Sequence, residues 1–172
     1  MKMLFAMIGI SGAAYLIGSV NSAVLISRLF FRDDVRNHGS GNAGTTNMMR
    51  TFGYRAGLAT FLGDVLKGVV SVFLARWLGS LFGLEVQHAA SAAAIAAVLG
   101  HMYPVYFHFQ GGKGVATGFG AVAALHPLIL LVLFGAGMPL ILLTGYVSVG
   151  SMTGAALYPF LLLGTMLYRG RI

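Results

Sequence analysis

Two glycine-rich segments carry the residues best suited to chemistry. The first reads GSGNAGTTNMMR over residues 39–50, and the second reads QGGKG over residues 110–114. Glycine backbone can curl so that several N–H groups point at one anion, and hydroxyls, amides and an arginine fork add further donors. The first segment therefore predicts a phosphate site. Its candidate groups are Gly39, Ser40, Gly41, Asn42, Thr45, Thr46, Asn47 and Arg50.

The second segment places Lys113 among three glycines, Gly111, Gly112 and Gly114. It offers a cation and free N–H groups to an anion, but it lacks the first glycine and the Ser or Thr of a Walker A loop. The first segment matches the dinucleotide fingerprint GxGxxG, yet a predicted membrane helix precedes it where a strand is required. We therefore expect no nucleotide cofactor.

A second set of ionisable residues falls inside apolar sequence. Asp64 and Lys67 lie three residues apart, on one helical face within a predicted span, so both side chains must face the protein interior. Two roles remain open for them, a structural ion pair and substrate binding. His101, in GHMYP, is a candidate for orienting the following loop or for acid–base work. Because no histidine pair has metal-ligand spacing with a carboxylate, we expect no metal.

The elements that position these residues follow from composition. The chain has 172 residues, of which 58% are hydrophobic and only 9% are charged, too few to cover a water-soluble domain. The net charge of +7 comes from cations scattered between apolar runs, which argues against a nucleic-acid surface. The sequence thus predicts an all-α integral membrane protein, a polytopic bundle of about five to six transmembrane helices, some short or broken.

The apolar runs predict spans at residues 3–31, 56–82, 89–107 and 152–168. The polar stretch 32–55 carries four arginines and is therefore expected on the cytoplasmic side, and Lys113 brings the second segment to the same face.

Residues 119–143 allow two readings, one span or two short helices that reverse near Pro127. One span would put Arg169 and Arg171 in the cytoplasm and the loop expected at 145–151 outside, and the reversal would exchange these sides.

Four blocks resemble a known family: GSGNAGTTNMMR (39–50), DVLKG (64–68), GHMYPVYFHFQGGKGVATGFG (100–120) and SVGS (148–151). They are similar to the bacterial acyl-phosphate-dependent glycerol-3-phosphate acyltransferases, the PlsY family. The resemblance implies transfer of a fatty acyl group from acyl phosphate to the 1-hydroxyl of sn-glycerol 3-phosphate. The products would be lysophosphatidic acid and phosphate, formed at the cytoplasmic face of the bacterial inner membrane. Implied partners are the two substrates, membrane lipid and the soluble enzyme that makes acyl phosphate.

The resemblance also implies roles for individual residues. Ser40, Arg50 and Lys113 would contact substrate phosphates, and Ser148 would be a further polar site residue. Thr45, Thr46 and Asn47 would support the first loop. The substrate's own phosphate would act as the base, without a covalent intermediate, metal or cofactor.

The chain departs from the family at its C-terminal end. Relatives of this type usually have seven helices, the last with a His-x-x-Asn element, and residues 1–172 are therefore expected to form a single acyltransferase domain that is incomplete at its C-terminus. The alternative function is a membrane transporter or channel for phosphate-like anions, which could use the same glycine-rich loops.

Overall fold

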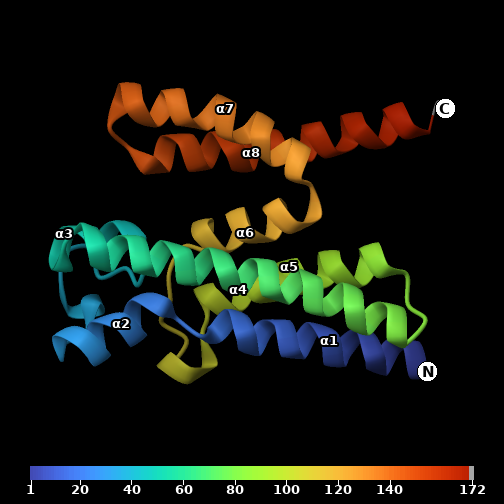
Figure 1. Ribbon diagram of the computed structural model, residues 1–172, viewed down its shortest axis with the longest axis horizontal. Coiled ribbons are helices and arrows are strands. Elements are labelled where there is room, and N and C mark those ends of the chain that lie inside the picture. Colours follow the sequence, from blue (N-terminus) through green and yellow to red (C-terminus); the bar gives the residue numbers. More distant parts are fainter. Residues whose placement is uncertain (171–172) are drawn as a thin grey trace. The chain divides into compact units, whose positions relative to one another are not determined.

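The computed structural model describes residues 1–170, apart from the side chain of Arg169. Arg171, whose side of the membrane was left open above, lies outside the described residues. The chain divides into two compact units, Met1–Leu125 and His126–Ile172. That the two units form a single acyltransferase domain stays a prediction. All regular secondary structure in the described part is helical (Figure 1). The elements are α1 (Lys2–Ser19), α2 (Ser22–Phe31), η1 (Val35–Asn37), α3 (Thr45–Phe52), α4 (Tyr54–Leu81), α5 (Val86–Met102), η2 (Val105–Phe107), α6 (Val115–Leu125), α7 (Pro127–Thr144) and α8 (Val147–Arg169).

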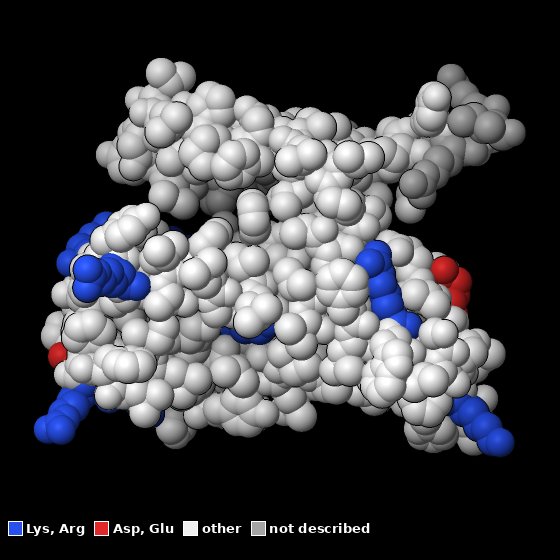
Figure 2. All heavy atoms as spheres, in the orientation of Figure 1, with Lys and Arg blue, Asp and Glu red and all other residues white. Residues whose placement is uncertain are grey.

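Five segments of the described chain are long and apolar enough to cross a membrane: Lys2–Phe31, Tyr54–Leu81, Val86–Phe107, Pro127–Thr144 and Val147–Tyr168. This confirms the predicted all-α integral membrane fold. Figure 2 shows charged side chains mostly at the two ends of the first unit, with a largely uncharged band between them. That distribution fits a bilayer, whose apolar core excludes charge and whose surfaces accept it.

Helix α4 buries polar side chains and exposes apolar ones, as expected of a helix surrounded by lipid. It buries Asp64, Lys67 and Ser71, whereas Leu62 and Leu66 are more than half exposed. A helix of a water-soluble bundle would turn these faces the other way. Hydrocarbon around the protein removes the cost of exposing leucine, and the polar groups turn inward to find partners.

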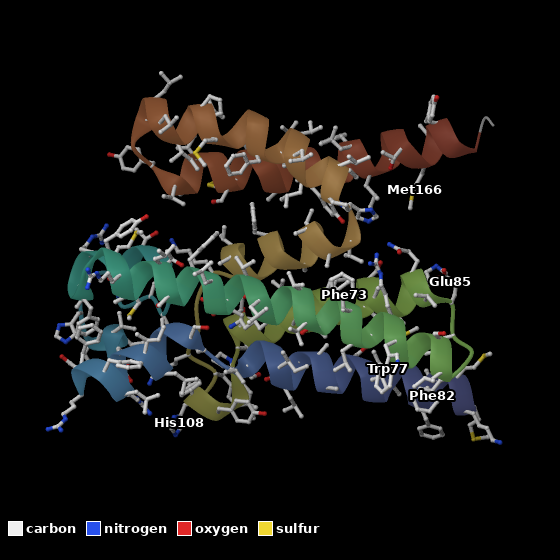
Figure 3. The ribbon with its side chains drawn as sticks, in the orientation of Figure 1. Phe73, Trp77, Phe82, Glu85, His108 and Met166 are labelled. Carbon is white, nitrogen blue, oxygen red and sulfur yellow. The ribbon has the colours of Figure 1, made fainter. Side chains whose placement is uncertain are left out.

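Aromatic residues mark the end of the first unit that lies away from the glycine-rich loops. Trp77 and Phe82 lie near Glu85 there, and His108 lies at the opposite end (Figure 3). Tryptophan favours the interface between hydrocarbon and water. The Glu85 carboxylate accepts from the N–H groups of Gln87 and His88 and so caps α5 at this end; the His88 N–H bond lowers the pKa of Glu85.

The span predicted as one helix at residues 3–31 is broken at Val20 and Asn21. Asn21 caps α2, since its Oδ1 accepts from the Val24 N–H at 3.1 Å. Val20 has extended backbone, and its carbonyl accepts from Lys67 Nζ at 2.8 Å. The hydropathy pattern missed this break because a single buried asparagine hardly changes the average over the span.

Residues 119–143 do not form one continuous helix, so the single-span reading is wrong. Helix α6 ends at Leu125, and α7 begins with Pro127 at its first position, where the missing N–H costs no helical hydrogen bond. The loop expected at 145–151 is also shorter than predicted, because α8 begins at Val147. Likewise, the polar stretch 32–55 contains α3, which hydropathy alone did not reveal.

Close packing of α1 against α5 depends on small residues. A Cβ placed on Gly18 would lie 2.1 Å from the Ala97 carbonyl oxygen, and one on Gly100 would lie 2.2 Å from the Tyr15 carbonyl oxygen. The neighbouring buried alanines complete the contact. The two backbones therefore approach as closely as small-residue membrane contacts allow.

We predict that Gly18→Ala destabilises the protein by about 1–3 kcal/mol, since the methyl group meets backbone that cannot move aside. Gly12→Ala, on the same helix with nothing within 4 Å, is the matched control and should be neutral or stabilising by up to about 1 kcal/mol. Unfolding in detergent, followed by circular dichroism, compares the two. Equal stability of both variants would contradict the packing described.

Candidate functional site

The first loop, residues 38–44, is held in shape by Asn47 of α3. The Asn47 Nδ2 group donates to the carbonyls of Val35 and His38, both at 3.0 Å, and its Oδ1 accepts from the Ser40 N–H at 3.1 Å. Both amide hydrogens are thus engaged with the loop itself. The predicted supporting role of Asn47 fits this geometry, and its predicted contact with a substrate anion stays a prediction.

Glycine is required where the first loop turns. Gly39 and Gly41 have φ of +57° and +70°, in the left-handed region that glycine favours. A Cβ on Gly39 would also lie 2.3 Å from the Asn47 Oδ1. The loop therefore turns tightly enough for Asn47 to brace it from inside.

The side chains of the first segment that were predicted to bind a ligand differ in their exposure to solvent. Ser40, Thr46 and Arg50 are exposed, and Thr46 and Arg50 lie one turn apart on α3. Asn42 is half-buried. The Thr45 hydroxyl is buried and has no hydrogen-bond partner among the described residues. Ser40, Thr46 and Arg50 are therefore the side chains of this segment most open to a ligand from solvent.

The second loop, residues 108–114, leads into α6. The Gly112 N–H donates to the His101 carbonyl at 3.1 Å, and Gly114 has φ of +80° immediately before the helix. A Cβ on Gly111 would lie 2.0 Å from the His101 carbonyl oxygen. Lys113 is exposed between these constrained glycines. The loop therefore presents one cation from a backbone that is fixed against the end of α5.

The two loops lie side by side, which confirms the prediction that they share one face. A Cβ on Gly112 would lie 2.7 Å from the Ala43 carbonyl oxygen of the first loop. Arg36 of η1 donates to the carbonyls of Phe107 and Gln110, at 3.0 and 3.3 Å. Loops separated by some seventy residues in sequence are thus joined directly.

Asp34 holds Arg36 in this bridging position. The Arg36 guanidinium donates to both Asp34 oxygens, at 2.9 and 2.7 Å, and Arg28 donates to Oδ2 at 2.9 Å. The hydrogen bonds from Arg36, and then from Arg28, hold the pKa of Asp34 well below its usual range. Asp34 in turn raises the pKa of Arg36. Neither Asp34 nor Arg36 was among the predicted site residues, although the opposite charges in RDDVR were a usable signal.

Asp64, Lys67 and His101 are brought together in the interior. Lys67 Nζ lies 2.9 Å from Asp64 Oδ1, as an ion pair without hydrogen-bond alignment, and 2.8 Å from His101 Nδ1. Asp64 is 1% exposed, Lys67 6% and His101 3%. Such burial favours the structural ion pair over direct substrate binding. The carbonyl bond to Gly112 supports the prediction that His101 orients the following loop.

Ser148 belongs to the second unit, in the first turn of α8, where it is exposed and its carbonyl accepts from the Ser151 hydroxyl at 3.1 Å. Its membership of the site stays a prediction. Within the described residues, no group of three or more histidine or acidic side chains could hold a metal ion. The arrangement that remains is two anion-suited loops at one end of a membrane bundle, with exposed Arg50 on the helix that follows the first loop and exposed Lys113 in the second.

Comparison with known proteins shows the family to which the chain belongs. The family model described as glycerol-3-phosphate acyltransferase matches residues 8–170. The glycerol-3-phosphate acyltransferases of Clostridioides difficile and Thermoanaerobacter pseudethanolicus are 41% and 44% identical, over 93% and 86% of this chain and 78% and 72% of theirs. The chain therefore belongs to the glycerol-3-phosphate acyltransferase family.

Solved structures agree. Crystal structures of PlsY (YgiH), an integral membrane glycerol 3-phosphate acyltransferase, match in the glycerol 3-phosphate form with a TM-score of 0.81 and 38% identity, covering 92% of this chain and 77% of that chain. The lysophosphatidic acid form matches with a TM-score of 0.77 and 35% identity, covering 92% and 76%. The predicted resemblance is confirmed, and the family match favours an acyltransferase over the transporter alternative.

We predict that Asp34→Asn lowers the free energy of unfolding at pH 7 by about 1.5–3 kcal/mol, because Arg36 loses its charged acceptor. The lowered pKa makes the carboxylate's contribution complete above the ordinary value of 3.8 and lost as pH falls below it. Wild type and variant should therefore differ constantly above about pH 5 and converge in acid. Chemical denaturation over this pH range measures the difference.

Asp33→Asn is the control for this prediction. The Asp33 carboxylate is 41% exposed and its ion pair is with the exposed His38, so the effect at pH 7 should be smaller. A pH-independent difference between wild type and Asp34→Asn down to pH 2 would show that the carboxylate charge does not stabilise the loop bridge.

Proposed function

We propose that this protein transfers a fatty acyl group from acyl phosphate to the 1-hydroxyl of sn-glycerol 3-phosphate. The observation that carries the proposal is the contact between two glycine-rich loops in a chain of the glycerol-3-phosphate acyltransferase family. Arg50, on the helix after the first loop, and Lys113, in the second loop, are both exposed. Both proposed substrates carry phosphate, so two adjacent anion sites suit the reaction. The apolar exterior of the helices is compatible with an acyl chain that arrives from the bilayer.

The reaction needs little covalent chemistry from the protein. The glycerol hydroxyl oxygen attacks the acyl carbonyl carbon, a new C–O ester bond forms, and the C–O bond to phosphate breaks. The hydroxyl proton passes to a phosphate oxygen, and inorganic phosphate and lysophosphatidic acid leave. The protein's contribution is to orient two anions and to stabilise the developing oxyanion with N–H groups.

The structure suggests how this work is divided. In this proposal the exposed Arg50 of α3 offers a planar guanidinium to one phosphate, and the exposed Ser40 of the first loop adds a hydroxyl. Lys113 offers a point charge from the second loop, together with backbone N–H groups of the glycines around it. Asn47 shapes the first loop, and Ser148 adds a polar group from α8 in this proposal.

The membrane orientation belongs to the same proposal. Arg32, Arg36, Arg50, Arg55 and Lys113 gather on the segments that carry the two loops. The positive-inside rule then puts the loops at the cytoplasmic face of the bacterial inner membrane. Water-borne glycerol 3-phosphate would reach them there, as would acyl phosphate delivered by the soluble enzyme that makes it.

Purified protein in lipid, given acyl phosphate and glycerol 3-phosphate, should release inorganic phosphate and form lysophosphatidic acid only when both substrates are present. Arg50→Ala and Lys113→Ala should each lower kcat by about 100-fold or more, as expected for removing a donor that stabilises developing charge. Arg55→Ala removes an exposed cation just beyond α3 and is the matched control, with a rate near that of wild type.

Three results of this assay or of a vesicle flux assay would reject the proposal. Acyl transfer from acyl-coenzyme A without phosphate release would reject the acyl phosphate donor. Wild-type rates in both Arg50→Ala and Lys113→Ala would remove the two loops from the reaction. Anion flux through vesicles without acyl transfer would return the transporter alternative.

A further inference from the structure

We propose that His101 is a positioning residue, held by Lys67 and Asp64, that fixes the two glycine-rich loops relative to each other. The proposal rests on the acyl transfer proposed above. His101 lies at the end of α5 and is almost fully buried, so it acts through the backbone of the loops.

Lys67 determines which ring nitrogen of His101 carries the proton. An ammonium group can only donate, so His101 Nδ1, 2.8 Å away, accepts. The ring proton of the uncharged imidazole then lies on Nε2. Lys67 Nζ also donates to the Val20 carbonyl, and the Asp64 carboxylate, 2.9 Å away as an ion pair, balances its charge. The orientation of the His101 ring is therefore set from the side away from the loops.

The opposite edge of the ring faces the place where the loops meet. A Cβ on Gly112 would lie 2.2 Å from His101 Nε2 and 2.7 Å from the Ala43 carbonyl oxygen. The Gly112 N–H also donates to the His101 carbonyl. Gly112 is thus held between the His101 ring, the His101 backbone and the first loop. Moving the ring would change the separation of Ala43 from Gly112.

The first loop is tied to the same interior from another direction. Asn21 Nδ2 donates to the Ala43 carbonyl at 3.4 Å, and the residue before it, Val20, accepts from Lys67. The break between α1 and α2 and the end of α5 therefore meet at one ammonium group. This arrangement links the placement of both loops to Lys67.

The expected kinetic signature is a fall in kcat with little change in KM. If each loop keeps its own phosphate donors, each substrate still binds, but the hydroxyl and the acyl carbonyl lose their alignment. A misplacement of about 1 Å can lower the rate by about 100-fold. A residue that only stabilised the fold would instead lower the melting temperature and leave the rate per folded molecule unchanged.

The first test uses His101→Leu and His101→Gln. His101→Leu should lower kcat by about 10- to 100-fold with KM changed less than about threefold, and should speed amide hydrogen exchange in residues 38–44 and 108–114. Glutamine keeps an oxygen that can accept from Lys67, so His101→Gln should recover most of the loss. His88→Gln, in the first turn of the same helix and exposed, is the matched control.

A double variant tests the same role if His101→Leu does not fold. Asp64→Leu with Lys67→Met removes both charges together, a change that buried ion pairs often tolerate. This double variant should fold, lose kcat and show faster exchange in both loops. Wild-type kcat and exchange in the double variant, or equal kcat in His101→Leu and wild type, would overturn the proposal.

The exchange measurement separates this proposal from the proposed function, because it needs no substrate. If wild-type protein transfers no acyl group, the proposed reaction fails, while unchanged loop exchange in the variants would independently reject the positioning role.

Discussion

The polar interior of the first unit depends on the buried ammonium of Lys67. A cation this far from water is costly unless all of its donors find partners, and here it meets a carboxylate, a backbone carbonyl and an imidazole nitrogen. These partners belong to α4, to the break between α1 and α2, and to the end of α5. Satisfying one charge therefore fixes three helical segments, and two of them also bond to the glycine-rich loops, Asn21 to Ala43 and His101 to Gly112.

A second constraint, the bilayer, explains why this interior is polar at all. Exposed leucines cost nothing against hydrocarbon, so the helices gain little from burying large apolar side chains. They pack instead through glycine and alanine, as α1 and α5 do at Gly18 and Gly100. Polar groups such as Thr60 and Ser71 turn inward and bond to carbonyls one turn earlier on α4. The rigid end of the bundle on which the loops sit results from both effects.

The sequence predicted the membrane class, the location of most spans and the two loops, because hydropathy and glycine spacing are local properties. It missed the break at Val20 because one asparagine hardly changes the hydropathy of the span, and because Lys67, which donates to the freed Val20 carbonyl, lies 47 residues away. It did not give the loop carbonyls that Asn47 bonds, because a side chain's donors can be counted from sequence while their partners cannot. The bridge from Arg36 to the second loop was invisible for the same reason. Ser148 and the reading of the C-terminal region depend on how the second unit meets the first, which no local pattern specifies.

In the proposed mechanism two adjacent loops each bind one substrate phosphate. The most direct measurement is a crystal structure of the protein with glycerol 3-phosphate and a non-hydrolysable acyl phosphonate bound together. We expect one phosphorus group in contact with Arg50 and the first loop, the other beside Lys113 and the second loop, and the 1-hydroxyl facing the acyl carbonyl. Both phosphorus groups bound away from the loops, or both bound in one loop, would contradict this mechanism.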